Sequence, residues 1–378
     1  MEYKDQLKYL KVAIVHDWLV SLGGAERVVE SLLKLFPEAD LYTSVYDPEK
    51  VSILGKRKVH TTFLQHWPLA KSKHQLFASL RPLAFESLDF KGYDLVISSS
   101  SAESKGVITG TETLHISYIH TPIRYYWSGY DDYFKDPGFG TLNPLVRFMM
   151  PKMIKKLRKW DYSAAQRPDF MIANSNEVKN RIKKYYDRTS EVINPPVNTE
   201  RFSPKNQEYD GGYYLVVSRL VPYKRVDLAV RACTELGVKL VVAGRGPELK
   251  NLKKLAGNTI EFVENPSDNQ INQLYSGAKG FIFSAEEDFG ITPVEAMACG
   301  IPVVCYGKGG ATETVIDGKT GIFHSQQTVK SLKNAIDRFE STNFDKRTIR
   351  KRAEVFSEQR FIDEIGGYVV EKIKKQNN

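Results

Sequence analysis

Short apolar segments alternate with helical patterns along almost the whole chain, and this alternation limits the possible folds more than any other feature. The expected strands lie at residues 12–15, 94–98, 114–119 and 170–173, and again at 213–217, 239–243, 260–263, 280–284 and 302–305. The expected helices lie at 25–35, 226–236, 269–276 and 328–339. Such alternation predicts an α/β fold with parallel sheets that are covered by helices on both faces.

The chain has 378 residues, which favours two domains over one. The break between them is expected near the paired prolines Pro195-Pro196 and the polar segment 203–212, because prolines and glycines punctuate linkers. We therefore predict an N-terminal domain at 1–197, a C-terminal domain at 198–356 and a final helix at 357–378 with Ser357 as its N-cap. The sequence leaves open where that helix docks.

Charge and cysteine content narrow the possible partners. Lys and Arg exceed Asp and Glu by 54 − 45 = 9, which suggests an anionic partner, but the acids are too evenly mixed in for a dedicated nucleic-acid binder. Cys233, Cys299 and Cys305 stand in apolar surroundings and are expected to be buried thiols. Scattered histidines argue against a zinc site. A polar N-terminus without a long apolar run predicts a cytoplasmic protein, or one peripheral on the cytoplasmic membrane face.

Two acids, Glu287 and Glu295, bracket seven residues between two expected strands. Pro293 suits the first turn of an intervening helix and Gly300 its end, so Glu287 should lie on a loop after a strand and Glu295 early in the helix. Ligands of open α/β sheets bind at that edge. A solvated acid and a glutamate at a helix start would explain the same spacing. The adjacent Phe289-Gly290 favours a ligand, because glycine lets the backbone come close to one.

Cations follow the first strand of the second half. Arg219 and Lys224 are expected on the loop before the helix at 226–236, where a diphosphate would need a guanidinium fork and a point charge. A solvated basic turn is the alternative. Gly244 follows the next strand and could admit a phosphate or a ribose, although a tight turn would equally require glycine.

The first half offers a second group of candidates. Gly23-Gly24 opens the first expected helix, where backbone N–H groups can approach an anion, although a plain strand–helix turn would look the same. His120 ends an apolar strand beside Arg124-Tyr125 and could point into a site, whereas a lone histidine is more often structural. Ser99 belongs to a hydroxyl-rich strand end that could contact an acceptor or cap a helix.

Residues 151–160 combine basic and apolar positions at helical spacing. Such a helix could lie on anionic lipid, where each cation contributes about 1 kcal/mol. It could equally be a surface helix that packs Met153 and Leu157 on the first domain. The sequence therefore predicts a helix here and leaves peripheral membrane contact as one of two roles.

Together these motifs resemble glycosyltransferase family 4, whose members are retaining enzymes of the GT-B fold, and the resemblance covers nearly the whole chain. Its specific parts are the acids at 287 and 295, the Ser-Arg-Leu…Lys segment at 218–224, Ala-Gly-Arg-Gly-Pro-Glu at 243–248 and Glu-Ala-Met-Ala-Cys-Gly at 295–300. The segment 120–127 (His-Thr-Pro-Ile-Arg-Tyr-Tyr-Trp) is similar to mannosyltransferases of bacterial O-antigen and capsule assembly. The resemblance implies two Rossmann-like domains that face each other across a deep cleft.

The resemblance also implies roles at matching positions. Arg219 and Lys224 would hold the donor diphosphate, Glu287 the donor sugar and Glu295 the ribose, and His120 would hydrogen-bond the sugar. The nucleotide-sugar site would be completed by Gly23, Gly24, Gly244, Phe289, Gly290, Ile291 and Thr292. The acceptor would contact Ser99, Arg124 and Tyr125. Such enzymes generally work without a metal or another cofactor.

The predicted function is transfer of a hexose, mannose from GDP-mannose by resemblance, to a glycan or a lipid-linked saccharide in cell-surface polysaccharide synthesis. The cations suit the negative charge that develops on the leaving diphosphate. Retention is expected at the front face, with the leaving phosphate taking the acceptor proton. The alternatives are a UDP- or dTDP-sugar donor, a GT-B nucleotide-sugar epimerase and a non-catalytic sugar-nucleotide-binding protein. A dehydrogenase would show GxGxxG in its first βαβ unit, which this chain lacks.

Overall fold

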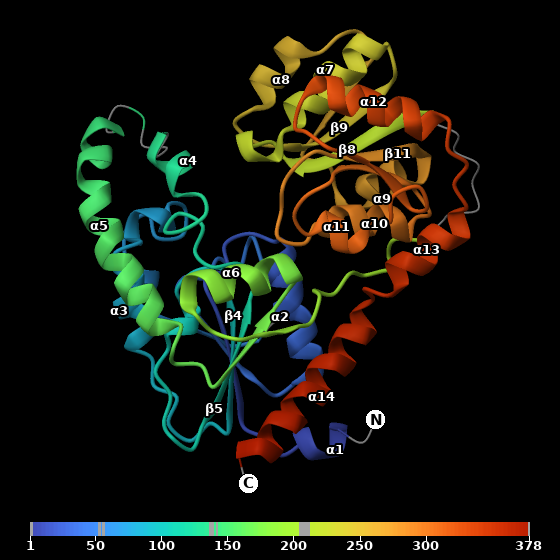
Figure 1. Cartoon of the computed structure of the whole chain (residues 1–378). Coiled ribbons are helices and arrows are strands. Elements are labelled where there is room, and N and C mark those ends of the chain that lie inside the picture. The colour runs from blue at the N-terminus through green and yellow to red at the C-terminus, as the bar shows by residue number, and fades with distance from the viewer. Residues whose placement is uncertain are drawn as a thin grey trace. The chain divides into compact units, whose positions relative to one another are not determined.

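The computed structural model describes residues 3–51, 54, 57–135, 140, 143–203 and 212–376. Most of the predicted polar segment, residues 204–211, lies outside the described residues. The chain divides into two compact units: unit 1 comprises Met1–Asn194 and Phe361–Asn378, and unit 2 comprises Pro195–Arg360. Each unit is a parallel sheet with helices on its faces, which confirms the predicted α/β fold with two Rossmann-like halves (Figure 1).

Unit 1 contains a seven-stranded sheet in the order β3-β2-β1-β4-β5-β6-β7. Its strands are β1 (Val12–His16), β2 (Asp40–Thr43), β3 (Val59–Thr61), β4 (Leu95–Ser100), β5 (Leu114–Ile119), β6 (Phe170–Ala173) and β7 (Glu191–Val192). Its α-helices are α1 (Tyr3–Leu7), α2 (Gly24–Leu35), α3 (Arg81–Glu86), α4 (Tyr130–Lys135), α5 (Asn143–Ala164), α6 (Asn176–Tyr186) and most of α14 (Glu358–Gln376). Short 3-10 turns are η2 (Phe63–His66), η3 (His74–Phe77) and η4 (Ser104–Gly106).

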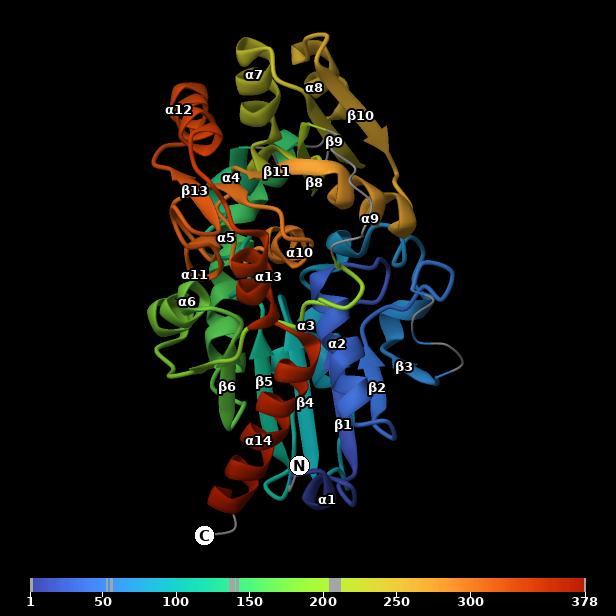
Figure 2. The same cartoon turned by 90° about the vertical axis from the view of Figure 1, so that its right-hand side faces the viewer.

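The central strands of unit 1 are buried on both faces, which explains their unbroken apolar runs. Every residue of β1, β4 and β5 is buried. Ile14 packs with α2 on one face, while Ala13 and Val15 pack with Phe85 of α3 on the other. All strand pairs are parallel, so their carboxyl ends form one edge of the sheet (Figure 2).

Helix α14 belongs to both units. The Ser357 hydroxyl accepts a hydrogen bond from the Arg360 N–H at 3.4 Å, which confirms the predicted N-cap. From Phe361 onward the helix packs into the core of unit 1, where Ile365 and Val369 join the cluster around β1 and α2. The C-terminal helix therefore docks on unit 1, which the sequence alone did not predict.

Unit 2 contains a six-stranded parallel sheet in the order β10-β9-β8-β11-β12-β13. Its strands are β8 (Tyr213–Arg219), β9 (Leu240–Arg245), β10 (Ile260–Glu264), β11 (Ala278–Phe283), β12 (Val303–Tyr306) and β13 (Gly321–His324). Its helices are η6 (Pro222–Lys224), α7 (Val226–Leu236), α8 (Leu249–Leu255), α9 (Asp268–Gly277), α10 (Ile291–Ala298), α11 (Ala311–Thr314), α12 (Val329–Glu340) and α13 (Lys346–Glu354). Among the described residues, no helix has the length and apolar character needed to cross a bilayer.

Two expectations about local structure were wrong. Arg219 was expected on a loop, but β8 continues through it, because its backbone stays in register with Arg245 of β9. Helix α5 was expected from Pro151, but it begins at Asn143 and contains the proline. The predicted helix started at Pro151 because a proline in a helix interior usually disrupts the helix. Here burial of Met150 and its neighbours in an apolar cluster outweighs that local cost.

Candidate functional site

The acidic loop of unit 2 joins the carboxyl end of β11 to α10. Gly290 precedes α10 with φ +86, a left-handed conformation that only glycine adopts without strain. The helix places Glu295 as its fifth residue, and Gly300, with φ +78, follows its end. The predicted positions of Glu287 on the loop and Glu295 in the helix are therefore confirmed.

Glu287 and Lys224, from different strand ends, form an ion pair between Oε1 and Nζ. The Lys224 side chain is only 15% exposed and the Glu287 side chain only 17%, so the pair is largely shielded from water. Arg219 lies nearby in sequence but is more exposed, and its guanidinium donates a hydrogen bond to the Tyr223 hydroxyl at 2.7 Å. The structure thus brings one predicted cation directly to the predicted sugar-binding acid.

A hydrogen bond from the buried Tyr275 orients the Glu295 carboxylate. The Tyr275 hydroxyl donates a hydrogen bond to Oε2 of Glu295 at 3.1 Å and lies 3.4 Å from the carbonyl oxygen of Thr292. Burial, reinforced by the charge of Glu295, raises the pKa of Tyr275 well above its usual value, so the hydroxyl remains a donor. This contact fixes one carboxylate oxygen of Glu295.

Gly309 and Gly310, which were not predicted from the sequence, support the acidic loop. The Gly310 N–H donates to the carbonyl oxygen of Glu287 at 2.8 Å. A β-carbon on Gly309 would lie 2.6 Å from that same oxygen, and one on Gly310 would lie 2.3 Å from the Cα of Phe289. Close backbone packing therefore requires glycine at both positions. The Gly-Gly pair shortly after β12 was the signal that could have revealed this support.

Two other predicted ligand contacts have structural explanations of their own. A β-carbon on Gly244 would lie 1.9 Å from the carbonyl oxygen of Ser218, so strand packing alone requires glycine there. The Phe289 side chain is 2% exposed and packs against Phe356 in the core of unit 2. Phe289 therefore presents almost no surface to a ligand and supports the loop from the core of unit 2. Ile291 and Thr292 form the partly exposed first turn of α10.

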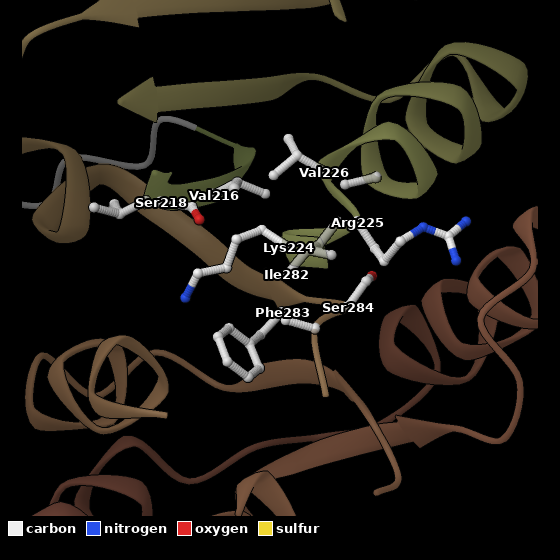
Figure 3. Close-up of a pocket in the computed structure, with 11 residues that line it drawn as sticks. Val216, Ser218, Lys224, Arg225, Val226, Ile282, Phe283 and Ser284 are labelled. Atoms are coloured by element: carbon white, nitrogen blue, oxygen red, sulfur yellow. The ribbon is translucent and has the colours of Figure 1, made fainter. Parts of the chain in front are cut away.

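A pocket lies against Lys224 at the carboxyl ends of β8 and β11 (Figure 3). About 270 Å³ of unoccupied space lies along its lining, a volume that includes open solvent. Lys224 and Arg225 leave the same turn in opposite directions (Figure 3), and Arg225 is paired with Asp227. Ser284 is 4% exposed, and its hydroxyl has no hydrogen-bond partner among the described residues.

A second polar group lies at the strand ends of unit 1. His16, the last residue of β1, has Nδ1 3.1 Å from both the carbonyl oxygen and the hydroxyl of Ser99. The Ser99 hydroxyl is 2.8 Å from Nε2 of His120, which directly follows β5. On its other side, His16 Nε2 lies 3.7 Å from Oε1 of Glu26 in the first turn of α2. His16 and Glu26 were missed, although a histidine after an apolar run was visible in the sequence.

Burial acts on the two histidines in different ways. Burial and the charge on His16 together lower the pKa of His120 to about 3, against the opposing charge of Asp17. His16 is also penalised by burial, but its close contact with Glu26 and the charges of Glu26 and Asp17 outweigh the penalty and raise its pKa above the ordinary 6.5. His120 is therefore neutral near neutral pH, while the surroundings of His16 stabilise its charged form.

Asp17 organises the loop after β4. Its carboxylate accepts backbone N–H bonds from Ser101 at 2.6 Å, Ala102 at 2.9 Å and Ser104 at 2.8 Å. The loop cannot move without breaking these charge-assisted bonds, each of which contributes about 1.5–3 kcal/mol. Asp17 thereby holds the strand end that carries Ser99.

The predicted acceptor residues are mostly engaged within unit 1. Ser99 is fully buried, which leaves it no surface for an acceptor. The Tyr125 hydroxyl donates to Oε1 of Glu103 at 2.9 Å, beside the buried Glu103–Arg81 pair. Arg124 is partly exposed and begins the turn that leads to α4.

The two glycines predicted for the nucleotide-sugar site lie at the start of α2. Gly23 precedes α2, and a β-carbon there would lie 3.1 Å from Oε2 of Glu26. Gly24 is the first residue of α2.

Family models match two adjoining parts of the chain. Residues 22–201 match the model described as Glycosyltransferase Family 4, and residues 198–356 match Glycosyl transferases group 1. The chain belongs to glycosyltransferase family 4. The two matches meet between 198 and 201, close to the junction of the two units.

Curated relatives in this family include mannosyltransferases. The GDP-mannose-dependent alpha-(1-6)-phosphatidylinositol monomannoside mannosyltransferase of Mycolicibacterium smegmatis is 32% identical over 174 residues, 39% of this chain and 46% of that enzyme. The matched region thus spans less than half of that relative. Alpha-1,3/1,6-mannosyltransferase ALG2 of Dictyostelium discoideum is 25% identical over 89% of this chain and 90% of its own length.

Solved GT-B glycosyltransferases have the same fold. HepE of Anabaena, determined with UDP and glucose, covers 97% of this chain and 100% of its own, with a TM-score of 0.67 at 19% identity. Sucrose-phosphate synthase from Thermosynechococcus elongatus gives a TM-score of 0.71 at 18% identity over 97% of this chain and 100% of its own. At such identities the likeness supports the fold alone. The protein is a glycosyltransferase with GT-B architecture.

No group of three or more His, Cys, Asp or Glu side chains among the described residues is arranged to hold a metal ion.

Proposed function

We propose that this glycosyltransferase transfers mannose from GDP-mannose, with retention of configuration, to a glycan or lipid-linked saccharide in cell-surface polysaccharide synthesis. Unit 2 would bind the nucleotide sugar and unit 1 the acceptor. The observation that carries the proposal is the shielded Lys224–Glu287 pair at the strand ends of unit 2. Lys224 can exchange its carboxylate partner for a diphosphate oxygen, and Glu287 can then accept hydrogen bonds from sugar hydroxyls.

The remaining residues take complementary roles in this proposal. Arg219 joins Lys224 on the diphosphate and stabilises the negative charge that develops as the glycosidic bond breaks. Glu295, oriented by Tyr275, accepts hydrogen bonds from the ribose. The first turn of α10, Ile291 and Thr292 after Gly290, presents backbone N–H groups to the phosphates. His120 donates a hydrogen bond to a substrate sugar. No metal is required for these steps.

Retention follows if the acceptor attacks from the face that the diphosphate leaves. The leaving phosphate oxygen then takes the acceptor proton, so no carboxylate acts as a covalent nucleophile. Two acids flanking the sugar would be needed for the double-displacement scheme. Here the second acid, Glu295, is directed to the ribose in our proposal, which leaves Glu287 alone near the sugar.

The choice of mannose rests on the relatives. The mycobacterial enzyme is named as GDP-mannose-dependent, and ALG2 is named as a mannosyltransferase. HepE was determined with UDP and glucose, so a UDP-sugar is the leading alternative donor. A panel of GDP-, UDP- and dTDP-sugars in thermal-shift assays will decide this, because a ligand that binds only the folded state raises the melting temperature. Stabilisation by GDP-mannose alone is expected, and stabilisation by another donor alone would refute the choice.

Catalysis itself is tested by Glu287→Ala. Product formation from donor and acceptor should be lost, while the variant remains folded. Activity within a few-fold of the wild type would contradict the role of Glu287. An epimerase would isomerise the donor sugar without any acceptor, so chromatography of donor incubated with enzyme alone distinguishes that reaction.

A lipid-linked acceptor would bring the protein to a membrane, and α5 offers a suitable surface. Its exposed apolar residues are Leu145, Phe148, Met149 and Met153, with Phe148 85% exposed. Its exposed lysines are Lys152, Lys155, Lys156 and Lys159. Leu157 packs inward as expected, whereas Met153 is 37% exposed and does not. Such a stripe suits an anionic bilayer surface, where lysines attract headgroups and apolar side chains insert.

Sedimentation with vesicles tests this contact. Wild-type protein should sediment with phosphatidylglycerol vesicles but not with phosphatidylcholine vesicles. Phe148→Glu should weaken binding to the phosphatidylglycerol vesicles at least several-fold. Tyr9→Glu is a matched control, because Tyr9 is 84% exposed in the same unit but lies outside α5. Equal binding by Phe148→Glu and wild type would exclude α5 as the contact.

A further inference from the structure

Four side chains of unit 1 form one series of polar contacts that leads from a buried carboxylate to His120. The register of the sheet pairs His16 of β1 with Ser99 of β4, so their side chains lie on the same face. Glu26 approaches His16 from α2, and His120 approaches Ser99 from the end of β5. We call Glu26, His16, Ser99 and His120 the histidine chain. His16, Ser99 and Glu26 are all less than 9% exposed.

The chemistry of the atoms gives the histidine chain a direction. Nδ1 of His16 lies 3.1 Å from the Ser99 carbonyl oxygen, which can only accept, so Nδ1 carries a hydrogen. The Ser99 hydroxyl oxygen, also 3.1 Å away, faces that same hydrogen. Among the described residues, the hydroxyl hydrogen is then left with one partner, Nε2 of His120 at 2.8 Å. Nε2 accepts, and a neutral imidazole that accepts at Nε2 carries its hydrogen at Nδ1.

The other ring nitrogen of His120 is placed to meet a ligand. No hydrogen bond to Nδ1 exists among the described residues. His120 is 9% exposed, the largest exposure in the histidine chain. Its ring is held edge-on against Tyr118, with centroids 5.2 Å apart, which limits rotation. An N–H directed outward from a fixed ring can donate one hydrogen bond in a set direction.

We propose that the histidine chain holds His120 as the Nδ1–H tautomer, which donates a hydrogen bond to an oxygen of the substrate sugar, with His16 and Ser99 as positioning residues. The identity of the ligand rests on the proposed function, but the tautomer does not. A donor at this position selects sugars that present a hydroxyl or ether oxygen to it. His120 thus binds by donation and does not act as a general acid or base.

The charged groups around the histidine chain agree with this direction. Glu26 and Asp17 both favour the charged form of His16, with hydrogens on both nitrogens. Burial and the nearby charge of His16 keep His120 neutral by lowering its pKa, against the opposing charge of Asp17. Gly23 leaves room for the Glu26 carboxylate, because a β-carbon there would lie 3.1 Å from Oε2.

Nitrogen-15 NMR of the ligand-free protein labelled at histidine tests the tautomer directly. The His120 signals are assigned by their loss in His120→Gln. We expect a pyrrole-type shift for Nδ1 and a pyridine-type shift for Nε2 in the wild type. Ser99→Ala should mix the two tautomers. Ser98→Ala is the matched control, because Ser98 bonds His115 and Ser117 instead and its loss should leave the His120 signals in place. A hydrogen on Nε2, or averaged shifts in the wild type, would overturn the proposal.

A donor titration separates this inference from the proposed function. Binding of GDP-mannose should shift the Nδ1 signal of His120, and His16→Gln should lower kcat/KM about 3- to 10-fold, the effect of misplacing one hydrogen bond. An Nδ1–H tautomer that no nucleotide sugar perturbs would leave the histidine chain intact and remove His120 from the donor site. If the donor shifts the His120 signals but the hydrogen lies on Nε2, His120 belongs to the donor site and the proposed tautomer is wrong.

Discussion

Replacing Lys224 with Met removes one charge from the most shielded ion pair of the candidate donor site. The methionine keeps most of the side-chain volume, so packing around η6 should persist. Glu287 loses its cation while remaining only 17% exposed. The variant therefore changes two quantities at once, donor affinity and folding stability, and the two can be separated.

The expected magnitudes follow from the geometry. Loss of one charge-assisted contact to a diphosphate costs about 1.5–3 kcal/mol, or roughly a 10- to 150-fold weaker Kd. Removing one partner of a fully buried pair costs about 3–5 kcal/mol of stability. Because both side chains retain some exposure, we expect a smaller loss of about 1–2 kcal/mol.

Calorimetric titration with GDP-mannose and urea unfolding measure the two effects. Adding Glu287→Gln to Lys224→Met should restore most of the stability, because no carboxylate is then left without its cation, but should not restore affinity. Lys333→Met is the control, since Lys333 pairs with Glu235 on the exposed surface of the same unit. The reasoning fails if Lys224→Met binds the donor within about twofold of wild type, or if the double variant regains affinity.

Three further outcomes are expected. Lys105→Met should destabilise the protein by about 3–5 kcal/mol in thermal unfolding, because it leaves Asp161 charged and fully buried; a loss below about 1 kcal/mol would contradict a charged pair. Lowering the pH from about 7 to about 5 should lower the free energy of unfolding, measured by urea titration, by up to about 2 kcal/mol each for His115 and His120. Burial lowers the folded-state pKa of both histidines to about 3, so only the unfolded chain binds the proton, whereas His16, whose pKa is raised, adds stability as the pH falls. The three buried thiols should react with Ellman's reagent only after unfolding, and fast labelling of the native protein would refute their burial.

Much of the fold was readable from the sequence because it depends on local patterns. The expected strand at 114–119 and helix at 226–236 match β5 and α7 residue for residue, since each is a short apolar or periodic run with clear ends. Predicted element boundaries were wrong where a neighbouring element determines them. Strand β8 extends to Arg219 because β9 continues beside it. Helix α5 continues through Pro151 because its apolar face is buried.

The sequence by itself determined the α/β alternation, the acidic loop and the strand-end cations, because each depends on residue type and spacing within one segment. Only the tertiary structure decided which of these side chains meet: Lys224 pairs with Glu287, and Glu295 is held by Tyr275. It also revealed the histidine chain, whose members come from three strand ends and a helix. Parallel strands bring distant residues to one edge, and the register that aligns them is a property of the sheet rather than of any single segment.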